Sequence, residues 1–140
     1  MMSYFDKNNI IKEELLDTEA EKVAKSFIVY RFNRNTNSNE PDDKNSLSSA
    51  QLRRFFNEFR QLEKRVHVDG FQKVKPLIKM VKSKASYASN PKRNGKIIPA
   101  FKDFLVTNLD KIDTEKEFEA FMLHFEAVVG FFYGMGVSNS

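Results

Sequence analysis

Apolar residues recur along most of this chain at the three- and four-residue spacing of an α-helix. No segment of useful length alternates apolar and polar residues as a half-buried strand does. The pattern therefore predicts an all-α protein, a single compact helical bundle of about five helices. We expect the helices over residues 10–32, 48–66 and 71–88, then from Pro99 through Leu109, and from Asp113 or Thr114 to Tyr133.

The expected buried faces are rich in phenylalanine and aliphatic residues. On the second helix the apolar positions fall within about 100° of arc, the width of a stripe that faces a core. Core packing is accordingly the favoured role for most of the fourteen phenylalanines. The stripe residues of the last four helices are Leu52, Phe55, Phe56, Phe59, Leu62 and Val66; Val74, Leu77, Ile78, Val81, Ala85 and Ala88; Phe101, Phe104, Leu105 and Leu109; and Phe118, Phe121, Met122, Phe125, Val128, Val129 and Phe132.

Three helices have capping-box patterns, in which a Ser or Thr and a Glu or Gln three residues later satisfy each other's backbone N–H groups. Ser48 with Gln51 predicts the start of the second helix, and Thr114 with Glu117 the start of the fifth. The same pattern at Thr18 and Glu21 indicates that the first helix breaks near Asp17.

Two segments interrupt the helical pattern. Residues 33–46 are polar and lack periodicity, which predicts a flexible loop or linker within a single helical domain of residues 1–140. Pro76 lies early in the third helix, where it either opens the main helix or kinks one that began earlier. The sequence leaves these two alternatives open.

The formal net charge of +4 conceals a strong segregation of charge along the chain. Residues 46–100 contain 13 Lys and Arg against 3 Asp and Glu, a balance of +10, whereas the segments before and after them balance at −2 and −4. So many uncompensated cations repel one another unless an anion is near. This block predicts a polyanionic partner, although a solvated helix surface gives the same pattern.

Basic residues at helical spacing on the second and third helices, with those of the following loop, suit a phosphate backbone. Such contacts release counterions and bind without reading bases, so the affinity depends on salt and little on sequence. Tyr87, next to Lys84, is either a half-buried tyrosine or a platform for a base. The candidate RNA-binding residues are Arg53, Arg54, Arg60, Lys64, Lys75, Lys79, Lys82, Lys84, Lys92 and Arg93.

The chain shows no recognisable catalytic or cofactor motif, so we expect a non-enzyme without a metal or cofactor. It has no cysteine, and its two histidines, His67 and His124, stand alone. A ribonuclease that uses both histidines is a minor alternative, because it requires their proximity in the fold. The glutamates at 115, 117 and 119 point around a helix rather than to one spot, which favours helix capping over metal binding.

Three segments resemble the small subunit of type III-A CRISPR effector complexes, the Csm small-subunit family. They are LSSAQLRRFFNEFRQLE, LIKMVKSKASYASN and FKDFLVTNLDKIDTEKEFEAFMLHFEAVVGFFYG, and together they span roughly residues 46–134. The resemblance implies a non-catalytic helical bundle whose copies stack along the effector and line the channel that holds guide RNA and target RNA. It places Arg53, Arg54, Lys79, Lys82 and Lys84 among the RNA-facing residues. The chain departs from the family pattern at Ser86-Tyr87-Ala88, where basic residues follow only at Lys92 and Arg93.

The leading hypothesis is thus a small subunit that binds the RNA backbone and packs on other subunits of the effector complex, with self-association through apolar residues such as Phe131 and Tyr133. The alternative is a helical adaptor that docks an acidic protein through the same basic face. The charged N-terminus and the absence of a long apolar run predict a cytoplasmic protein without a membrane segment.

Overall fold

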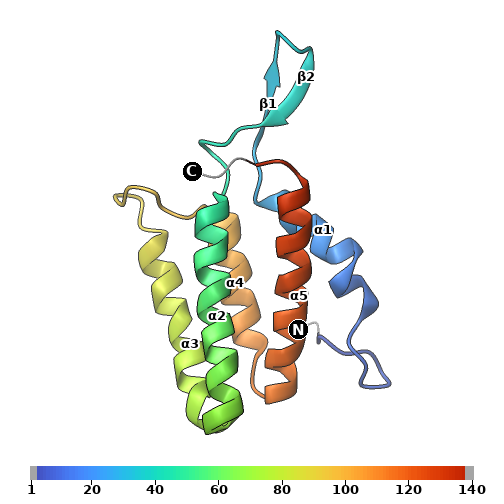
Figure 1. Cartoon of the computed structure of the whole chain (residues 1–140), viewed down its shortest axis with the longest axis vertical. Coiled ribbons are helices and arrows are strands. Elements are labelled where there is room, and N and C mark those ends of the chain that lie inside the picture. The colour runs from blue at the N-terminus through green and yellow to red at the C-terminus, as the bar shows by residue number, and fades with distance from the viewer. Residues whose placement is uncertain (1–2, 138–140) are drawn as a thin grey trace.

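The computed structural model describes residues 3–137, which fold mainly as α-helices (Figure 1). The predicted fold class is confirmed, although one two-stranded antiparallel sheet accompanies the helices in this part of the chain. The elements are the 3-10 helix η1 (Glu13–Leu16), α1 (Thr18–Ser26), β1 (Tyr30–Asn33), β2 (Ser38–Pro41), α2 (Ser49–Asp69), α3 (Phe71–Ala88), α4 (Pro99–Lys111) and α5 (Glu115–Gly134).

Helices α2 to α5 lie side by side along the long axis of the molecule, and the hairpin of β1 and β2 projects from one end (Figure 1). In this bundle α2 contacts α3 on one side and α5 on the other, while α3 also contacts α4. Helix α1 packs on α5. None of the helices within residues 3–137 is long and apolar enough to cross a membrane.

The predicted starts of α2 and α5 are confirmed together with their capping boxes. Ser48 Oγ accepts from Gln51 N at 3.1 Å, and Gln51 Oε1 accepts from Ser48 N at 3.1 Å. Thr114 Oγ1 accepts from Glu117 N at 3.2 Å, and Glu117 Oε1 accepts from Thr114 N at 3.0 Å. These bonds satisfy N–H groups that a helix start otherwise leaves free, which is why both boundaries could be predicted locally.

Helix α3 runs without interruption from Phe71 to Ala88 and contains Pro76. Of the two alternatives for this proline, the structure therefore shows a helix that began earlier. Gly70 joins α2 to α3 with φ +88, a left-handed backbone conformation that side chains other than glycine rarely adopt. The chain can consequently reverse within a single residue between two long helices.

The expected helix over residues 10–32 is wrong before Glu13 and beyond Ser26, and the expected break near Asp17 separates η1 from α1. Helix α1 ends at Ser26 because Phe27 and Ile28 turn into the core, and Leu47 N donates to Phe27 O at 2.9 Å. The expected capping box of Thr18 and Glu21 is also wrong, since Thr18 lies inside α1 and no side chain caps its N-terminus.

Residues 30–41 form a β-hairpin where the sequence predicted the end of a helix followed by an irregular loop. Its register pairs Tyr30 with Pro41 and Asn33 with Ser38, and Asn37 has φ 55 in the connecting turn. The prediction of an irregular segment over 33–46 is therefore wrong for β2. The hairpin shows no alternation of apolar and polar residues because most of its residues are exposed on both faces.

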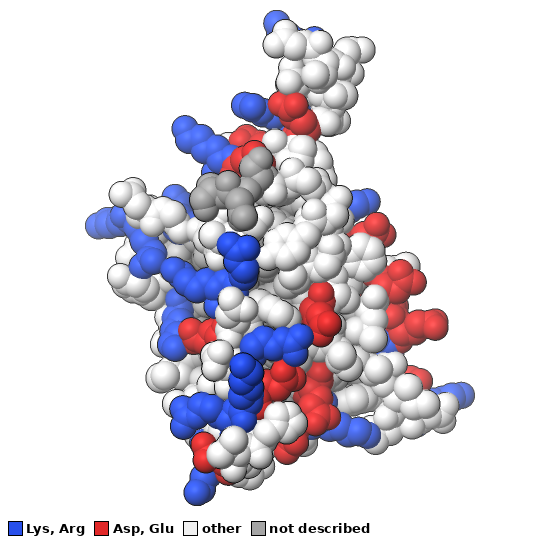
Figure 2. Space-filling view, in the orientation of Figure 1, with Lys and Arg blue, Asp and Glu red and all other residues white. Residues whose placement is uncertain are grey.

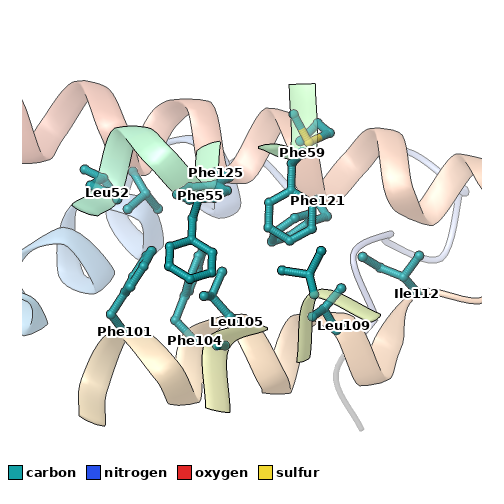
Figure 3. Close-up of a cluster of buried hydrophobic side chains, with 14 of the residues drawn as sticks. Leu52, Phe55, Phe59, Phe101, Phe104, Leu105, Leu109, Ile112, Phe121 and Phe125 are labelled. Carbon is teal, nitrogen blue, oxygen red and sulfur yellow. The ribbon is translucent and has the colours of Figure 1, made fainter. Parts of the chain in front are cut away.

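A cluster of phenylalanine rings fills the centre of the bundle (Figure 3). Phe125 is fully buried, and its ring lies 5.1 Å from that of Phe56 and 5.3 Å from that of Phe104, measured between centroids, in edge-to-face geometry. The rings of Phe59 and Phe101 lie at 6.0 and 6.3 Å, and that of Phe121 on the same helix lies at 5.6 Å. The apolar stripes predicted for α2, α4 and α5 thus meet in one core, with Phe56 only partly buried at its edge.

His124 lies on the buried side of α5, where its Nδ1 is 2.6 Å from the carbonyl oxygen of Leu15. Burial lowers the pKa of this imidazole below its ordinary value, so the ring is neutral near pH 7 and donates from Nδ1. The histidine thereby ties η1 to α5.

We expect the protein to lose stability as the pH falls through about 6.5, the ordinary pKa of histidine in an unfolded chain. Below that pH the unfolded state binds a proton at His124 that the folded state does not, so the free energy of unfolding falls as the pH falls. His124→Asn keeps a donor near Nδ1 and removes the titration, and it should flatten the slope of urea unfolding free energy between about pH 7.5 and pH 5.5. His67→Asn is the matched control, because His67 is exposed, and it should keep the wild-type slope. Equal slopes in all three proteins would contradict this assignment.

Candidate nucleic-acid interface

The outer face of α2 carries cations that have no acidic neighbour. Glu58 on one flank of α2 pairs with Lys84 of α3 at 2.5 Å, and Arg60 on the other flank pairs with Glu126 of α5 at 3.1 Å. Between these flanks lie Arg53 and Lys64, about three helical turns apart and both exposed. Neither forms an ion pair with another described residue, so both charges face the solvent.

A groove between α2 and α3 adds further basic groups and an aromatic ring. Arg54, Glu58, Lys84, Tyr87 and Arg93 line it. The Arg93 guanidinium lies 4.7 Å from the centre of the Tyr87 ring, which is 68% exposed, and Arg93 Nε has no hydrogen-bond partner within residues 3–137. The groove therefore brings a guanidinium and an aromatic ring together in one place.

The loop after α3 brings one of its basic residues to this groove. Arg93 lines the groove itself, and Lys92 beside it is exposed. Gln51 at the start of α2 anchors the loop. Its Nε2 donates to the carbonyl oxygen of Gly95 and, at 3.2 Å, to that of Lys96. The loop cations are thus held against α2 rather than extended from the bundle.

The predicted lysine stripe on α3 has a different environment. Lys75 pairs with Asp113 at 3.7 Å, Lys82 pairs with Asp110, and Lys79 Nζ donates to the carbonyl oxygen of Leu109. Burial lowers the pKa of Lys79. These three lysines hold the C-terminal end of α4, where the helix dipole favours positive charge, and are turned away from the groove.

The ten predicted residues thus divide into two groups. Arg60, Lys75, Lys82 and Lys84 each have a carboxylate partner and Lys79 has a carbonyl partner, whereas the described structure gives none of the other five an acidic partner. Lys84 is kept in the surface because its side chain lines the groove, although Glu58 pairs with it there. Sequence reasoning missed Asp110 and Asp113 as partners, because no local signal links them to α3. We define the α2–α3 surface as Arg53, Arg54, Lys64, Lys84, Lys92 and Arg93.

The distribution of charge over the molecule agrees with this division. Figure 2 shows Lys and Arg gathered over α2 and α3, with Asp and Glu more frequent toward α1 and the start of α5. The basic middle segment of the sequence therefore forms one basic side of the fold, interrupted by the acidic partners described above.

Neither histidine belongs to a site that both could share. His67 is exposed in the last turn of α2, whereas His124 is buried against Leu15 and Phe104. Within residues 3–137 no group of three or more His, Asp or Glu side chains is placed to hold a metal. Glu117 is engaged in capping α5 and Glu126 in pairing with Arg60.

An apolar groove lies between η1, α1 and the last turns of α5. Leu16, Ala127, Phe131 and Met135 line it together with two glycines of α5 and Glu21. Tyr133, which the sequence suggested as a contact residue, is 47% exposed nearby on the same helix. The two candidate surfaces of the molecule therefore differ in chemistry, one basic and one apolar.

Comparison with known proteins assigns the family. The chain matches the family model described as Csm2 Type III-A over residues 11–135, which is most of its length. No curated protein and no solved structure matches the chain. Membership implies association with the other subunits of a Csm effector complex. The resemblance read from the basic and C-terminal segments is thereby confirmed, and the chain belongs to the Csm2 Type III-A family, the small subunit of type III-A CRISPR effector complexes.

Proposed function

We propose that this subunit binds the backbone of guide RNA and target RNA through the α2–α3 surface, without reading their sequence. The observation that carries the proposal is the separation of cations into two groups. Arg53, Arg54, Lys64, Lys92 and Arg93 have no carboxylate partner in the described chain, and they gather on α2 and the adjoining loop. A phosphate strand supplies the missing negative charge.

The chemistry of the surface favours phosphates over base edges. Arg53 and Lys64 project from the exposed face of a long helix, so an RNA backbone can approach them directly. A-form RNA has a deep and narrow major groove that side chains cannot read, which leaves phosphates and 2′-hydroxyls as the accessible groups. Weak contacts of this kind gain strength when several subunits line one strand.

The role is one of positioning, not of cleavage. The two histidines, which a ribonuclease of this chain would need together, lie apart: His124 is buried against Leu15 and His67 lies in the last turn of α2. In the same proposal the apolar groove lined by Leu16, Phe131 and Met135 packs against sister subunits, because an exposed apolar groove is stabilised when a neighbour covers it.

The test replaces the two free cations on the outer face of α2. Arg53→Gln with Lys64→Gln should weaken binding of RNA of any sequence, and the slope of log affinity against log salt should fall by about 0.7 to 0.9 for each phosphate that the variant no longer neutralises. Fluorescence anisotropy with labelled RNA at several salt concentrations measures both quantities. Helicity should stay unchanged, since both side chains are exposed.

Two charge-matched variants control for net charge. Lys22→Gln with Lys25→Gln removes two exposed cations from α1, and Lys75→Gln with Lys82→Gln removes two that already have acidic partners. Both should bind RNA nearly as the wild type does. An equal loss of affinity in all three variants would point to nonspecific attraction by net charge. Competition by an acidic peptide as effective as that by RNA would favour the alternative of an adaptor for an acidic protein.

A further inference from the structure

The β1–β2 hairpin presents two aromatic side chains on one face, and about half of the surface of each is exposed. Residues directly opposite each other in an antiparallel pair share a face, so the register places Tyr30 and Phe32 beside Pro41 and Asn39 on one side. Tyr30 is 47% exposed and Phe32 is 57% exposed. Neither ring contacts another aromatic ring or a cation within residues 3–137, although other phenylalanines of this protein pack in clusters.

The acidic residue of the hairpin is engaged on the other face. Glu40 pairs with Arg31 at 3.7 Å and accepts from Asn33 Nδ2 at 3.1 Å. The turn that follows β1 contains Arg34 and three residues with amide or hydroxyl side chains, and no acid. The aromatic face and the tip of the hairpin thus combine ring surfaces, a guanidinium and hydrogen-bonding groups, free of negative charge.

The hairpin is anchored at its base to the bundle. Val29 N donates to Ser46 Oγ at 2.8 Å, and Asp42 N donates to Val29 O at 2.6 Å. Figure 1 shows the hairpin projecting beyond the ends of the helices. The aromatic face is therefore held away from the helical core, where a strand of nucleic acid can reach it.

We propose that the β1–β2 hairpin is a second RNA contact, which takes unpaired bases against Tyr30 and Phe32 while Arg34 lies near a phosphate. Side chains two residues apart on a strand are about 6.6 Å apart, roughly twice the 3.4 Å spacing of stacked bases, so one base fits between the two rings. Stacking on aromatic rings binds single strands with little sequence preference. A protein partner is less favoured, because the tip of the hairpin has no apolar side chain to bury.

This inference does not rest on the α2–α3 surface, because the hairpin recognises unpaired bases and that surface recognises phosphates. The chain has no tryptophan, so Phe32→Trp in the full-length protein introduces a unique fluorescent reporter. A short oligouridylate should quench its emission by stacking, whereas an RNA duplex of the same length, whose bases are already stacked, should leave the emission nearly unchanged.

A variant that lacks both aromatic rings tests the same site through its affinity for single-stranded RNA. Tyr30→Ala with Phe32→Ala should weaken binding of single-stranded RNA at least about fivefold, the equivalent of one stacked base, and leave duplex binding unchanged. Tyr30→Phe with Phe32→Tyr should restore it. Tyr133→Ala is the matched control, because Tyr133 has the same 47% exposure on α5, and it should bind as the wild type does.

The outcomes separate the two RNA proposals. Arg53→Gln with Lys64→Gln should weaken the binding of duplex and single strand alike and keep the quenching at saturating RNA. The hairpin proposal fails if oligouridylate causes no quenching, if the duplex quenches equally, or if Tyr30→Ala with Phe32→Ala binds single strands like the wild type. Quenching by an acidic peptide but not by RNA would replace RNA with a protein partner.

Discussion

Phe125→Ala should lower the free energy of unfolding by about 3–5 kcal/mol, the range expected when a fully buried phenylalanine is truncated. Phe125 is fully buried, and its ring meets those of Phe56, Phe59, Phe101 and Phe104 from two neighbouring helices. Truncation removes buried apolar surface and leaves a cavity. The surrounding rings cannot fill it, because the long helices that carry them hold them in place. Urea unfolding followed by circular dichroism measures the change.

The control is Leu123→Ala on the same helix. Leu123 is 48% exposed, so its truncation removes much less buried surface and should change the stability by less than about 1 kcal/mol. A loss below about 2 kcal/mol for Phe125→Ala would show that the phenylalanine cluster repacks, and that the centre of the bundle is less tightly specified than its ring geometry indicates.

Tyr4→Phe should lower the free energy of unfolding by about 1–3 kcal/mol, although it removes a single oxygen atom. The Tyr4 hydroxyl donates to Asn108 Oδ1 at 2.8 Å, and both side chains are buried. Burial, together with the nearby Glu117, raises the pKa of the hydroxyl well above its ordinary range, so it remains a donor at all working pH values. Its loss leaves the amide oxygen of Asn108 buried without that partner.

A double-mutant cycle tests whether the penalty comes from the orphaned amide. Asn108 Nδ2 donates to Phe104 O at 2.8 Å within α4, and Asn108 Oδ1 accepts from Tyr4, so the amide links α4 to the N-terminal segment. Tyr4→Phe with Asn108→Leu replaces both partners by apolar groups and should recover much of the lost stability. If the double variant is as unstable as the sum of the two single variants, Tyr4 stabilises the fold by packing and not by its hydrogen bond.

The division of the cations changes which substitutions test RNA binding. Lys79 and Lys82 are, like Arg53, among the RNA-binding residues that the sequence predicts, yet each of the two lysines holds the end of α4. Their substitution mixes loss of charge with loss of packing, whereas Arg53 and Lys64 can be removed without disturbing a described ion pair. If substitution of Arg53 and Lys64 leaves RNA binding unchanged, the result therefore counts directly against RNA binding at the α2–α3 surface.

The amino-acid sequence determined the starts and inner faces of the long helices because those signals are local. Ser48 and Gln51 cap α2 within one turn, and the spacing of Phe55, Phe59 and Leu62 fixes its buried side whatever it packs against. The family followed from the same segments, since the quoted motifs lie on α2 to α5.

Only the tertiary structure decided which charges remain free and where the chain makes its hairpin. Arg60 meets Glu126 across 66 residues and Lys79 meets Leu109 across 30, and helix spacing cannot show such contacts. The hairpin escaped prediction for a related reason: neither of its faces packs on the core, so the alternation that marks a half-buried strand is missing. Local patterns fix a helix and its inner face, whereas the surroundings of an exposed charge or strand depend on residues that only folding brings near.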